Sequence, residues 1–385
     1  MALDASTLDQ LLSTLERFVR ERLMPLEAQI SAEDRIPADV VEEMKALGLF
    51  GMTIPEEYGG LGLNTEEECL AVQVLGRTAP AFRSVIGTNN GIGSQGLVMD
   101  GTEEQKAHYL PRMASGEIIG SFALTEPDVG SDSGAVKTSA RRDGDDFVLN
   151  GTKRWITNAP SAQLFTVFAR TDPEQAGARG VSAFLVDAES PGIELGKPDR
   201  KMGQQGAHVC DVIFNDCRVP AASVVGGPER LNRGFATAMK TLDRGRLHIS
   251  ALSVGCANRL IDESLAFATQ RKQFGQPIAE FQLIQAMLAD SKAEAYAAEC
   301  MVMDAARRRD AGEAVNTLAS CCKLFATEMV GRVADRAVQI HGGAGYMEEY
   351  AVARFYRDVR LFRIYEGTSQ IQQSIIARNL IREFA

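Results

Sequence analysis

A single carboxylate near the C-terminal end of the chain is the residue best suited to carry out chemistry. Glu366 is flanked by Ile364 and Tyr365 and is followed by Gly367. A carboxylate on such a loop can project into an apolar cleft, where desolvation raises its pKa towards the range of a general base. On spacing alone, an ordinary surface glutamate near a helix N-terminus is the favoured interpretation.

The residues after Gly367 predict the helix that would position this carboxylate. Ser369 with Gln372 fits a capping box, so the helix should begin just after Gly367. Apolar residues then recur at helical spacing, at Ile371, Ile375, Ile376 and Leu380. Glu366 is therefore expected in the loop that precedes a helix.

Four further stretches combine residue types that bind ligands: residues 122–132, 151–158, 271–275 and 339–343. The first two contain turns, hydroxyl groups and the only Trp of the chain, which suits a flat polar heterocycle. The other two contain arginine and glycine, which suit phosphates. Individually, each stretch also fits a plain structural role, namely a turn, a packed Trp, a surface Arg and a helix end.

Composition limits the class of protein. The 385 residues are 45% hydrophobic and 24% charged, which is typical of a soluble globular protein of two or three domains. A net charge of −10 argues against nucleic acid or an anionic membrane as the main partner. We expect no membrane span, because no run approaches ~20 apolar residues. No signal or transit peptide is recognisable, so we expect a cytoplasmic protein, with a mature mitochondrial-matrix form left open.

Cysteine, histidine and glycine patterns add three negative expectations. The seven cysteines lack a C-x-x-C pair, and we interpret them as buried small hydrophobic residues in a reducing compartment. The four histidines show no zinc-like spacing, so no metal site is expected. Residues 91–96 match G-x-G-x-x-G, but their surroundings read as helices and loops and do not favour a dinucleotide site.

Periodicity divides the chain into three domains. Residues 1–120 begin with apolar residues every three to four positions, from Leu8 to Leu23, which predicts helices. Residues 121–228 contain short β-type runs separated by turn residues, at 146–150, 164–169, 181–186 and 209–214. Residues 229–385 return to helical spacing and predict a bundle.

Taken together with the Glu366 stretch, these four stretches resemble the acyl-CoA dehydrogenase family, in the same order and spacing over nearly the whole chain. The resemblance implies an α+β multidomain fold with an N-terminal α-helical domain, a middle β-barrel-like domain and a C-terminal four-helix bundle. It also implies an FAD-dependent oxidoreductase of acyl-CoA catabolism. This enzyme would be a homotetramer that passes electrons to an electron-transfer flavoprotein.

The resemblance also assigns residues to the cofactor and the substrate. The FAD contacts it implies are Phe122, Leu124, Thr125, Ser131, Trp155, Thr157, Arg271, Gln273, Phe274, Gln282, Gln339, Gly342, Gly343, Thr368 and Gln370. The adenine end typically reaches a neighbouring subunit. The positions implied to contact the acyl-CoA thioester are Ser131, Asp243, Arg246, Gly367 and Arg378.

In this mechanism Glu366 takes a proton from C2 of the acyl group while hydride leaves C3 for flavin N5. A thioester carbonyl acidifies C2 too little for a carboxylate in water, so desolvation of Glu366 and hydrogen bonds to the carbonyl must contribute. Some branches of the family carry the base at the position of Gly245. Glycine cannot act as a base, so the chain is expected to be closer to the short- and medium-chain branch.

One motif departs from that branch. Phe82-Arg83-Ser84 resembles the Tyr-Arg-Ser of glutaryl-CoA dehydrogenases, in which the arginine binds a distal carboxylate. Arg83 is therefore a candidate substrate residue, or a surface cation at a helix end. Alternative functions are a glutaryl-CoA-type dehydrogenase acting on a dicarboxylyl-CoA, an oxygen-using relative, and a catalytically idle flavin- or CoA-binding module.

Overall fold

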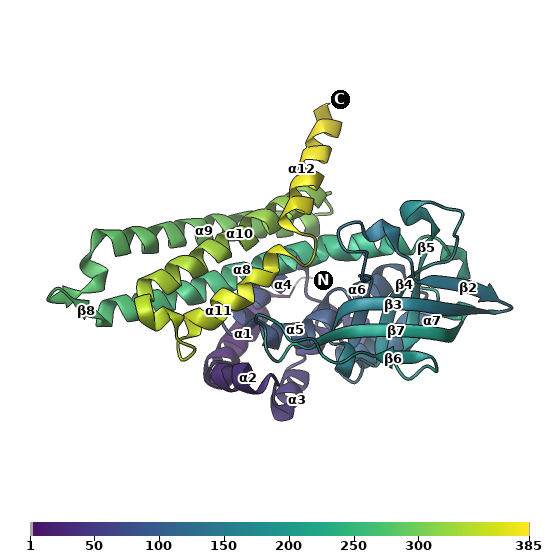
Figure 1. The fold of residues 1–385 in the computed structure, drawn as a ribbon, viewed down its shortest axis with the longest axis horizontal. Helices are drawn as coiled ribbons and strands as arrows, with labels where there is room; N and C mark the ends of the chain where they lie inside the picture. Colours follow the sequence, from purple (N-terminus) through teal and green to yellow (C-terminus); the bar gives the residue numbers. More distant parts are fainter. Residues whose placement is uncertain (1–2, 385) are drawn as a thin grey trace.

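The computed structural model describes residues 3–384, which form a helical part, a β-sheet and a second helical part in chain order (Figure 1). Large buried apolar clusters fill the N-terminal helices, the sheet and the C-terminal bundle. The predicted fold class is confirmed. Within the described residues no helix combines the length and apolarity that a bilayer span requires.

The N-terminal helices are short and are separated by turns. Their bounds are α1 Ala5–Phe18, α2 Glu27–Glu33, α3 Ala38–Ala46, α4 Thr65–Leu75, α5 Pro80–Asn90, α6 Gln95–Asp100 and α7 Glu103–Ala114. Asn64 and Glu67 form a capping box that starts α4. The apolar stripe predicted up to Leu23 does not form one regular helix, because a π-turn at Val19–Leu23 follows α1. The G-x-G-x-x-G match joins α5 to α6 without a strand, as expected.

The central sheet has the strand order β1-β4-β2-β3-β7-β6, and β5 pairs with β4. Its bounds are β1 Gly120–Ala123, β2 Ser139–Asp143, β3 Asp146–Thr157, β4 Leu164–Arg170, β5 Val181–Asp187, β6 Ile193–Leu195 and β7 Val209–Pro220. Two strands are longer than predicted, because β3 continues through Trp155 and β7 continues to Pro220. The β3–β7 register shifts between Lys153 and Ile156, and Trp155 adopts φ 55° there. Such irregularities redirect side chains out of a sheet.

Three long helices form the body of the C-terminal bundle: α8 Gly234–Gln270, α9 Gln282–Asp310 and α10 Asn316–His341. The shorter helices α11 Ala351–Val359 and α12 Ser369–Phe384 follow. The 37 residues of α8 extend about 55 Å. One end of α8 packs against β5, and the other leads into the small hairpin of β8 Lys272–Gln273 and β9 Gln276–Pro277 (Figure 1).

The cysteines only partly match their predicted burial. All seven are free thiols and five are buried, but Cys300 is exposed and Cys321 is half-buried. Cys321 and Cys322 are neighbours on α10, and consecutive helical residues point about 100° apart, so only Cys322 faces the core. No cluster of metal-ligating side chains occurs among residues 3–384.

Candidate active site

The loop that carries Glu366 joins a 3₁₀ turn, Arg360–Arg363, to α12. Glu366 has φ 56° and Gly367 has φ 88°, so a non-glycine residue occupies the left-handed region. Such a conformation persists only where its surroundings enforce it.

The predicted capping box of α12 was placed one residue too late. Ser369 already lies inside the helix, and its hydroxyl donates to Glu328 Oε1 at 2.6 Å. Thr368 performs the cap instead, because its Oγ1 accepts from the amide of Ile371 at 3.2 Å. The side chain of Gln372 serves the Glu366 loop, as described next.

Two buried side chains hold the Glu366 loop from behind. Lys323 Nζ donates to the carbonyl of Gly367 at 2.6 Å. Gln372 Nε2 donates to the carbonyls of Glu366 and Gly367, both at 3.1 Å. Both Lys323 and Gln372 are 0% exposed. Their hydrogen bonds explain how the strained turn is maintained.

One oxygen of the Glu366 carboxyl group, Oε2, is buried and has no hydrogen-bond partner among residues 3–384. A Cβ atom at Gly245 would lie 2.6 Å from this oxygen, so the glycine on α8 makes room for the carboxylate. Burial raises the pKa of Glu366 above its usual 4.5, while Arg83, Arg246 and Lys323 oppose that rise. A raised pKa makes a carboxylate a stronger base, which suits a general base.

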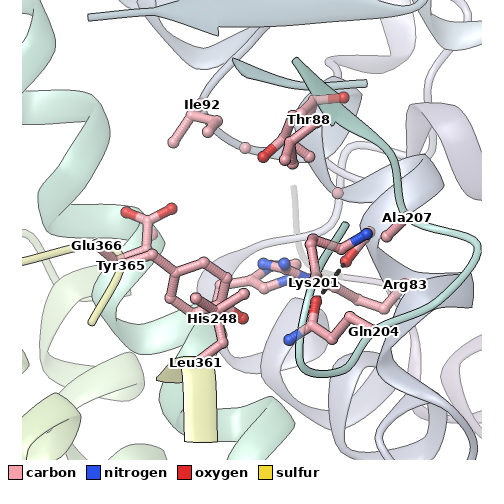
Figure 2. A pocket seen from close by; sticks show the side chains of 16 residues that line it. Arg83, Thr88, Ile92, Lys201, Gln204, Ala207, His248, Leu361, Tyr365 and Glu366 are labelled. Atoms are coloured by element: carbon pink, nitrogen blue, oxygen red, sulfur yellow. Dashed lines mark hydrogen bonds between the residues drawn. The ribbon is translucent and has the colours of Figure 1, made fainter. Parts of the chain in front are cut away.

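A cavity of about 70 Å³ opens beside this carboxylate. Figure 2 shows Glu366 on one wall and Arg83, Lys201 and Gln204 on the opposite wall. Ile92 and Leu361 contribute apolar surface. The lining of the cavity is mainly apolar, and α5 and the loop before β7 add cationic side chains to it.

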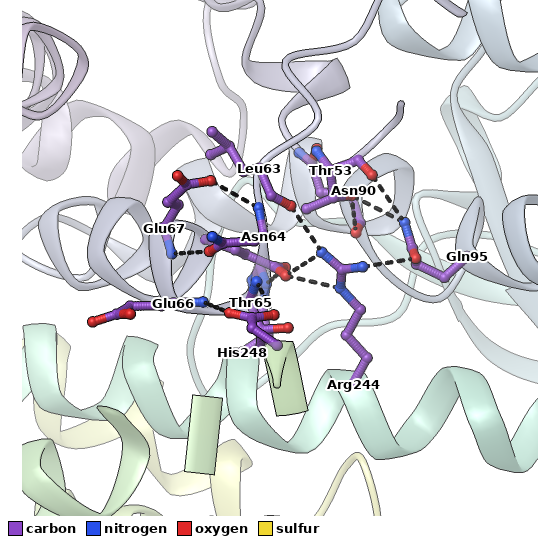
Figure 3. A network of polar contacts seen from close by, with 12 residues as sticks. Thr53, Leu63, Asn64, Thr65, Glu66, Glu67, Asn90, Gln95, Arg244 and His248 are labelled. Carbon is purple, nitrogen blue, oxygen red and sulfur yellow. Dashed lines mark hydrogen bonds and ion pairs between the residues drawn. The ribbon is translucent and has the colours of Figure 1, made fainter. Parts of the chain in front are cut away.

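Arg83 belongs to a chain of buried polar groups. Its Nε donates to Nε2 of His248 at 2.6 Å, and Nδ1 of His248 lies 2.7 Å from Glu68 Oε1. Arg244 binds the other oxygen of Glu68 at 2.8 Å and also donates to Gln95 (Figure 3). Arg83 thus lines the cavity, and the surface-cation alternative does not describe its position.

The residues implied to contact the thioester are only partly gathered here. Arg246 is buried on α8, acts electrostatically on Glu366 and pairs with Asp243 at 2.5 Å. Gly367 directly follows Glu366. Ser131 is exposed on the loop after β1, and Arg378 is exposed on α12. Neither of these two lines the cavity in one chain.

The residues implied to hold the flavin ring form one surface beside the cavity. Thr157 lines the cavity, and the amide of Arg154 donates to the carbonyl of Thr125 at 2.8 Å, which joins β3 to the segment after β1. Trp155 is 61% exposed, so it is not a core residue. An exposed aromatic face next to partly exposed hydroxyls fits a flat heterocycle such as the flavin. Phe122 is part-buried and Leu124 is buried beneath this surface.

The remaining residues implied to contact FAD lie in two other places. Thr368 and Gln370 lie at the start of α12, next to Glu366. The others surround the β8–β9 hairpin and the end of α10, at the far end of α8 from the sheet: Arg271, Gln273, Phe274, Gln282, Gln339, Gly342 and Gly343 (Figure 1). Phe274 is 95% exposed, and a Cβ atom at Gly342 or Gly343 would meet nothing within 4 Å. One chain therefore does not bring the two ends of this set together.

Several side chains at the site were not recognised from the sequence: Glu68, Lys201, Gln204, His248 and Lys323. A usable signal existed for Lys323, which falls between small and apolar residues on the buried face of α10. For Glu68, Gln204 and His248 the contacts join residues more than 100 positions apart, and no local pattern reports them.

Comparison with known proteins identifies relatives over nearly the full length. Family models for the N-terminal, middle and C-terminal domains of acyl-CoA dehydrogenase match residues 6–117, 121–217 and 232–381. A 3-(aryl)acrylate reductase of Clostridium sporogenes is 40% identical, covering 95% of this chain and 96% of the relative.

Solved structures agree. Butyryl-CoA dehydrogenase of Megasphaera elsdenii superposes with a TM-score of 0.94 at 32% identity, over 99% of each chain. A chain from a structure described as the electron transferring flavoprotein of Acidaminococcus fermentans has a TM-score of 0.94 at 35% identity, covering 97% of this chain and 98% of the other.

Proposed function

Because the chain belongs to the acyl-CoA dehydrogenase family, whose members are FAD-dependent oxidoreductases, we propose that Glu366 is the base that removes the C2 proton of its acyl-CoA substrate. The observation that carries this proposal is the buried, unpartnered Oε2 of Glu366 facing the cavity. Because no donor among residues 3–384 binds Oε2 of Glu366, this oxygen is free to accept a proton from the substrate. Its raised pKa strengthens it as a base.

The other residues of the chain prepare this proton transfer. Lys323 and Gln372 fix the backbone of the Glu366 loop, which restricts the direction of the carboxylate. Arg83, Arg246 and Lys323 favour the ionised carboxylate and so oppose the rise in pKa that burial causes. The chemistry that FAD supplies when bound is acceptance of the hydride that leaves C3. Thr125, Trp155 and Thr157 are the residues we assign to its ring.

We assign the exposed set around the β8–β9 hairpin to the adenine end of an FAD bound by another subunit. The separation of the two sets along α8 supports this assignment, and we propose an oligomer, the homotetramer, as the active form. We also propose an electron-transfer flavoprotein as the electron acceptor. The likeness to a chain in the Acidaminococcus fermentans structure supports that choice.

Arg83 favours a second candidate, the oxidation of a dicarboxylyl-CoA of the glutaryl type. Arg83 and Lys201 both line the cavity, and among residues 3–384 neither forms an ion pair with a carboxylate. Desolvation lowers the pKa of Lys201, as expected for a cation without such a partner. A distal carboxylate on the acyl chain would supply the missing anion.

A substrate panel tests both candidates. The purified protein should be yellow and should oxidise at least one of butyryl-, hexanoyl-, succinyl- and glutaryl-CoA with an artificial electron acceptor. The corresponding enoyl-CoAs with a reduced dye measure the reverse reaction, a reduction of a carbon–carbon double bond, and the name of the Clostridium sporogenes relative describes a reductase of 3-(aryl)acrylates. A protein that binds FAD but turns over no thioester in either direction would leave the idle-module alternative. A preference for plain acyl chains would remove the dicarboxylyl candidate.

A further inference from the structure

The protonation state of His248 is fixed by its two neighbours. Arg83 is a donor at every nitrogen, so Nε2 of His248 must present a lone pair to it. Glu68 is held as a carboxylate by Arg244 and His248, with its pKa lowered to about 2, so Nδ1 of His248 must carry the hydrogen. Only the neutral ring with hydrogen on Nδ1 satisfies both contacts. Consistently, desolvation and Arg83 lower the pKa of His248 to about 4.

This neutral contact leaves Arg83 positioned but not neutralised. Two arginines of α8 each pair with a carboxylate. Arg244 pairs with Glu68, and Arg246 pairs with Asp243. Arg83 instead meets an uncharged ring, and its terminal nitrogens have no acceptor among residues 3–384. The guanidinium therefore reaches the cavity with its charge and its fork of donors available (Figure 2).

We propose that His248, oriented by Glu68, is a positioning residue that fixes Arg83 as an uncompensated donor in the acyl pocket and so determines which acyl groups the enzyme accepts. The class it favours is an acyl group with an anionic or strongly accepting group at its distal end. A carboxylate partner in place of His248 would satisfy Arg83 internally and remove this preference. This inference rests on the proposed function only in assigning the cavity to the acyl group.

The contact between His248 and Arg83 also affects Glu366, the proposed base. Three cations face Glu366 from three helices, namely Arg83 from α5, Arg246 from α8 and Lys323 from α10. If Arg83 loses its anchor, one of the charges that favour the carboxylate form becomes weaker. The acid limb of the kcat/KM profile should then move to higher pH.

The test compares His248→Phe with His248→Gln. Glutamine has an amide N–H for Glu68 and a carbonyl for Arg83, so it preserves both contacts, whereas phenylalanine preserves neither. The probes are two acyl-CoA analogues that cannot be dehydrogenated because sulfur replaces C3, one with and one without a terminal carboxylate. Their affinities for the FAD-loaded protein are measured by calorimetry. Thr78→Val is the matched control, because it removes a buried hydrogen bond to Glu27 away from the cavity.

We expect His248→Phe to weaken the carboxylated analogue at least about tenfold relative to the plain one, because a charge-assisted contact is lost. His248→Gln should stay within about threefold of wild type. In a protein that already carries Arg83→Met, adding His248→Phe should not change the ratio of the affinities for the carboxylated and the plain analogue. If His248→Phe does not fold, His248→Leu serves as the second apolar variant.

If His248→Phe and the control Thr78→Val both weaken the two analogues to the same degree, His248 contributes to stability alone. That result would overturn the inference. An unchanged affinity ratio would do the same. A wild-type protein that binds both analogues but oxidises no thioester would overturn the proposed function, while the binding ratios still decide the role of His248.

Discussion

Two lysines in this protein are equally buried but differ in what surrounds them. Lys153 on β3 and Lys323 on α10 are both 0% exposed, and desolvation lowers the pKa of each to about 8. Nζ of Lys153 contacts Glu126 Oε1 at 2.7 Å and the carbonyls of Phe168 and Leu124 at 2.6 and 3.3 Å. Nζ of Lys323 has one contact, the carbonyl of Gly367.

The carboxylates near these lysines differ in the same way. Glu126 also accepts from the amides of Lys137 and Thr138, at 2.7 and 2.9 Å, so its oxygens are satisfied. The charge of Glu366 acts on Lys323, but the two side chains form no ion pair. Among residues 3–384, Oε2 of Glu366 has no hydrogen-bond partner. A perturbed pKa therefore does not by itself mark a catalytic group. The proposed role of Glu366 rests instead on a combination of features, since its carboxyl group lines the cavity and one of its oxygens is buried without a partner among residues 3–384.

The largest expected effect is on turnover. Glu366→Gln should lower kcat by at least ~10²–10⁴-fold, because it keeps the shape of the side chain and removes the base. Stopped-flow reduction of the bound flavin by acyl-CoA measures the effect. Analogue binding should be retained, which separates loss of chemistry from loss of the pocket. A variant that keeps more than about a tenth of wild-type kcat would place the base elsewhere.

The stability of Glu366→Gln relative to wild type, followed against pH, tests the direction of the pKa shift of Glu366. The folded-state pKa of Glu366 is raised, so its carboxyl favours folding below the unfolded value of 4.5 and loses that contribution as pH rises through the folded value. Glu366→Gln should therefore be as stable as wild type in acid and equally or more stable at pH 7. Thermal melts of the two proteins across this range decide the point.

Glu126→Gln should show the opposite behaviour. Removing this partner leaves the Lys153 ammonium buried and unpaired, which we expect to destabilise the protein by ~3–5 kcal/mol at pH 7. The pKa of Glu126 is lowered, so its contribution exists above 4.5 and fades as pH falls through the folded value. The deficit should accordingly shrink in acid. A Glu126→Gln protein of wild-type stability would erase the distinction between the two lysines.

A smaller effect is expected when Lys323 is changed in two ways. Lys323→Gln can still donate to Gly367 but lacks the charge, and Lys323→Met lacks both. Both should move the acid limb of kcat/KM to higher pH, because one cation facing Glu366 is gone. At pH values above the acid limb, only Lys323→Met should also lower kcat, by about tenfold, because the Glu366 loop is held less firmly. Identical profiles for the two variants would mean that the hydrogen bond to Gly367 is irrelevant.

The smallest effect belongs to the cap of α12. Thr368→Ala removes the acceptor for the amide of Ile371 and should cost ~1 kcal/mol, seen as faster hydrogen exchange in the first turn of α12. Turnover should change little, because Lys323 and Gln372 hold the Glu366 loop independently. A loss of activity comparable to that of Lys323→Met would show that the helix end, and not the buried lysine, fixes the base.

Local patterns predicted the parts of this site that depend on neighbours in sequence. The loop position of Glu366 followed from the apolar spacing of the helix after it, and the helical and β-rich parts followed from their periods. The cap was assigned to Ser369 because Gln372 lies three positions after it, whereas the structure shows that the amide of Ile371 donates to Thr368. Likewise, the bulge that exposes Trp155 depends on the register of β3 against β7, which no single strand encodes.

The sequence by itself determined the family and the fold class and singled out Glu366 as the candidate base, because ordered motifs and hydrophobic periods are properties of contiguous residues. The tertiary structure alone decided the surroundings of Glu366. It brought Lys323 behind Gly367, placed Arg83 against a neutral His248, and separated Trp155 from the β8–β9 hairpin along α8. Burial, pKa and unpaired atoms arise from residues distant in the chain that meet in space, so only the packed structure reveals them.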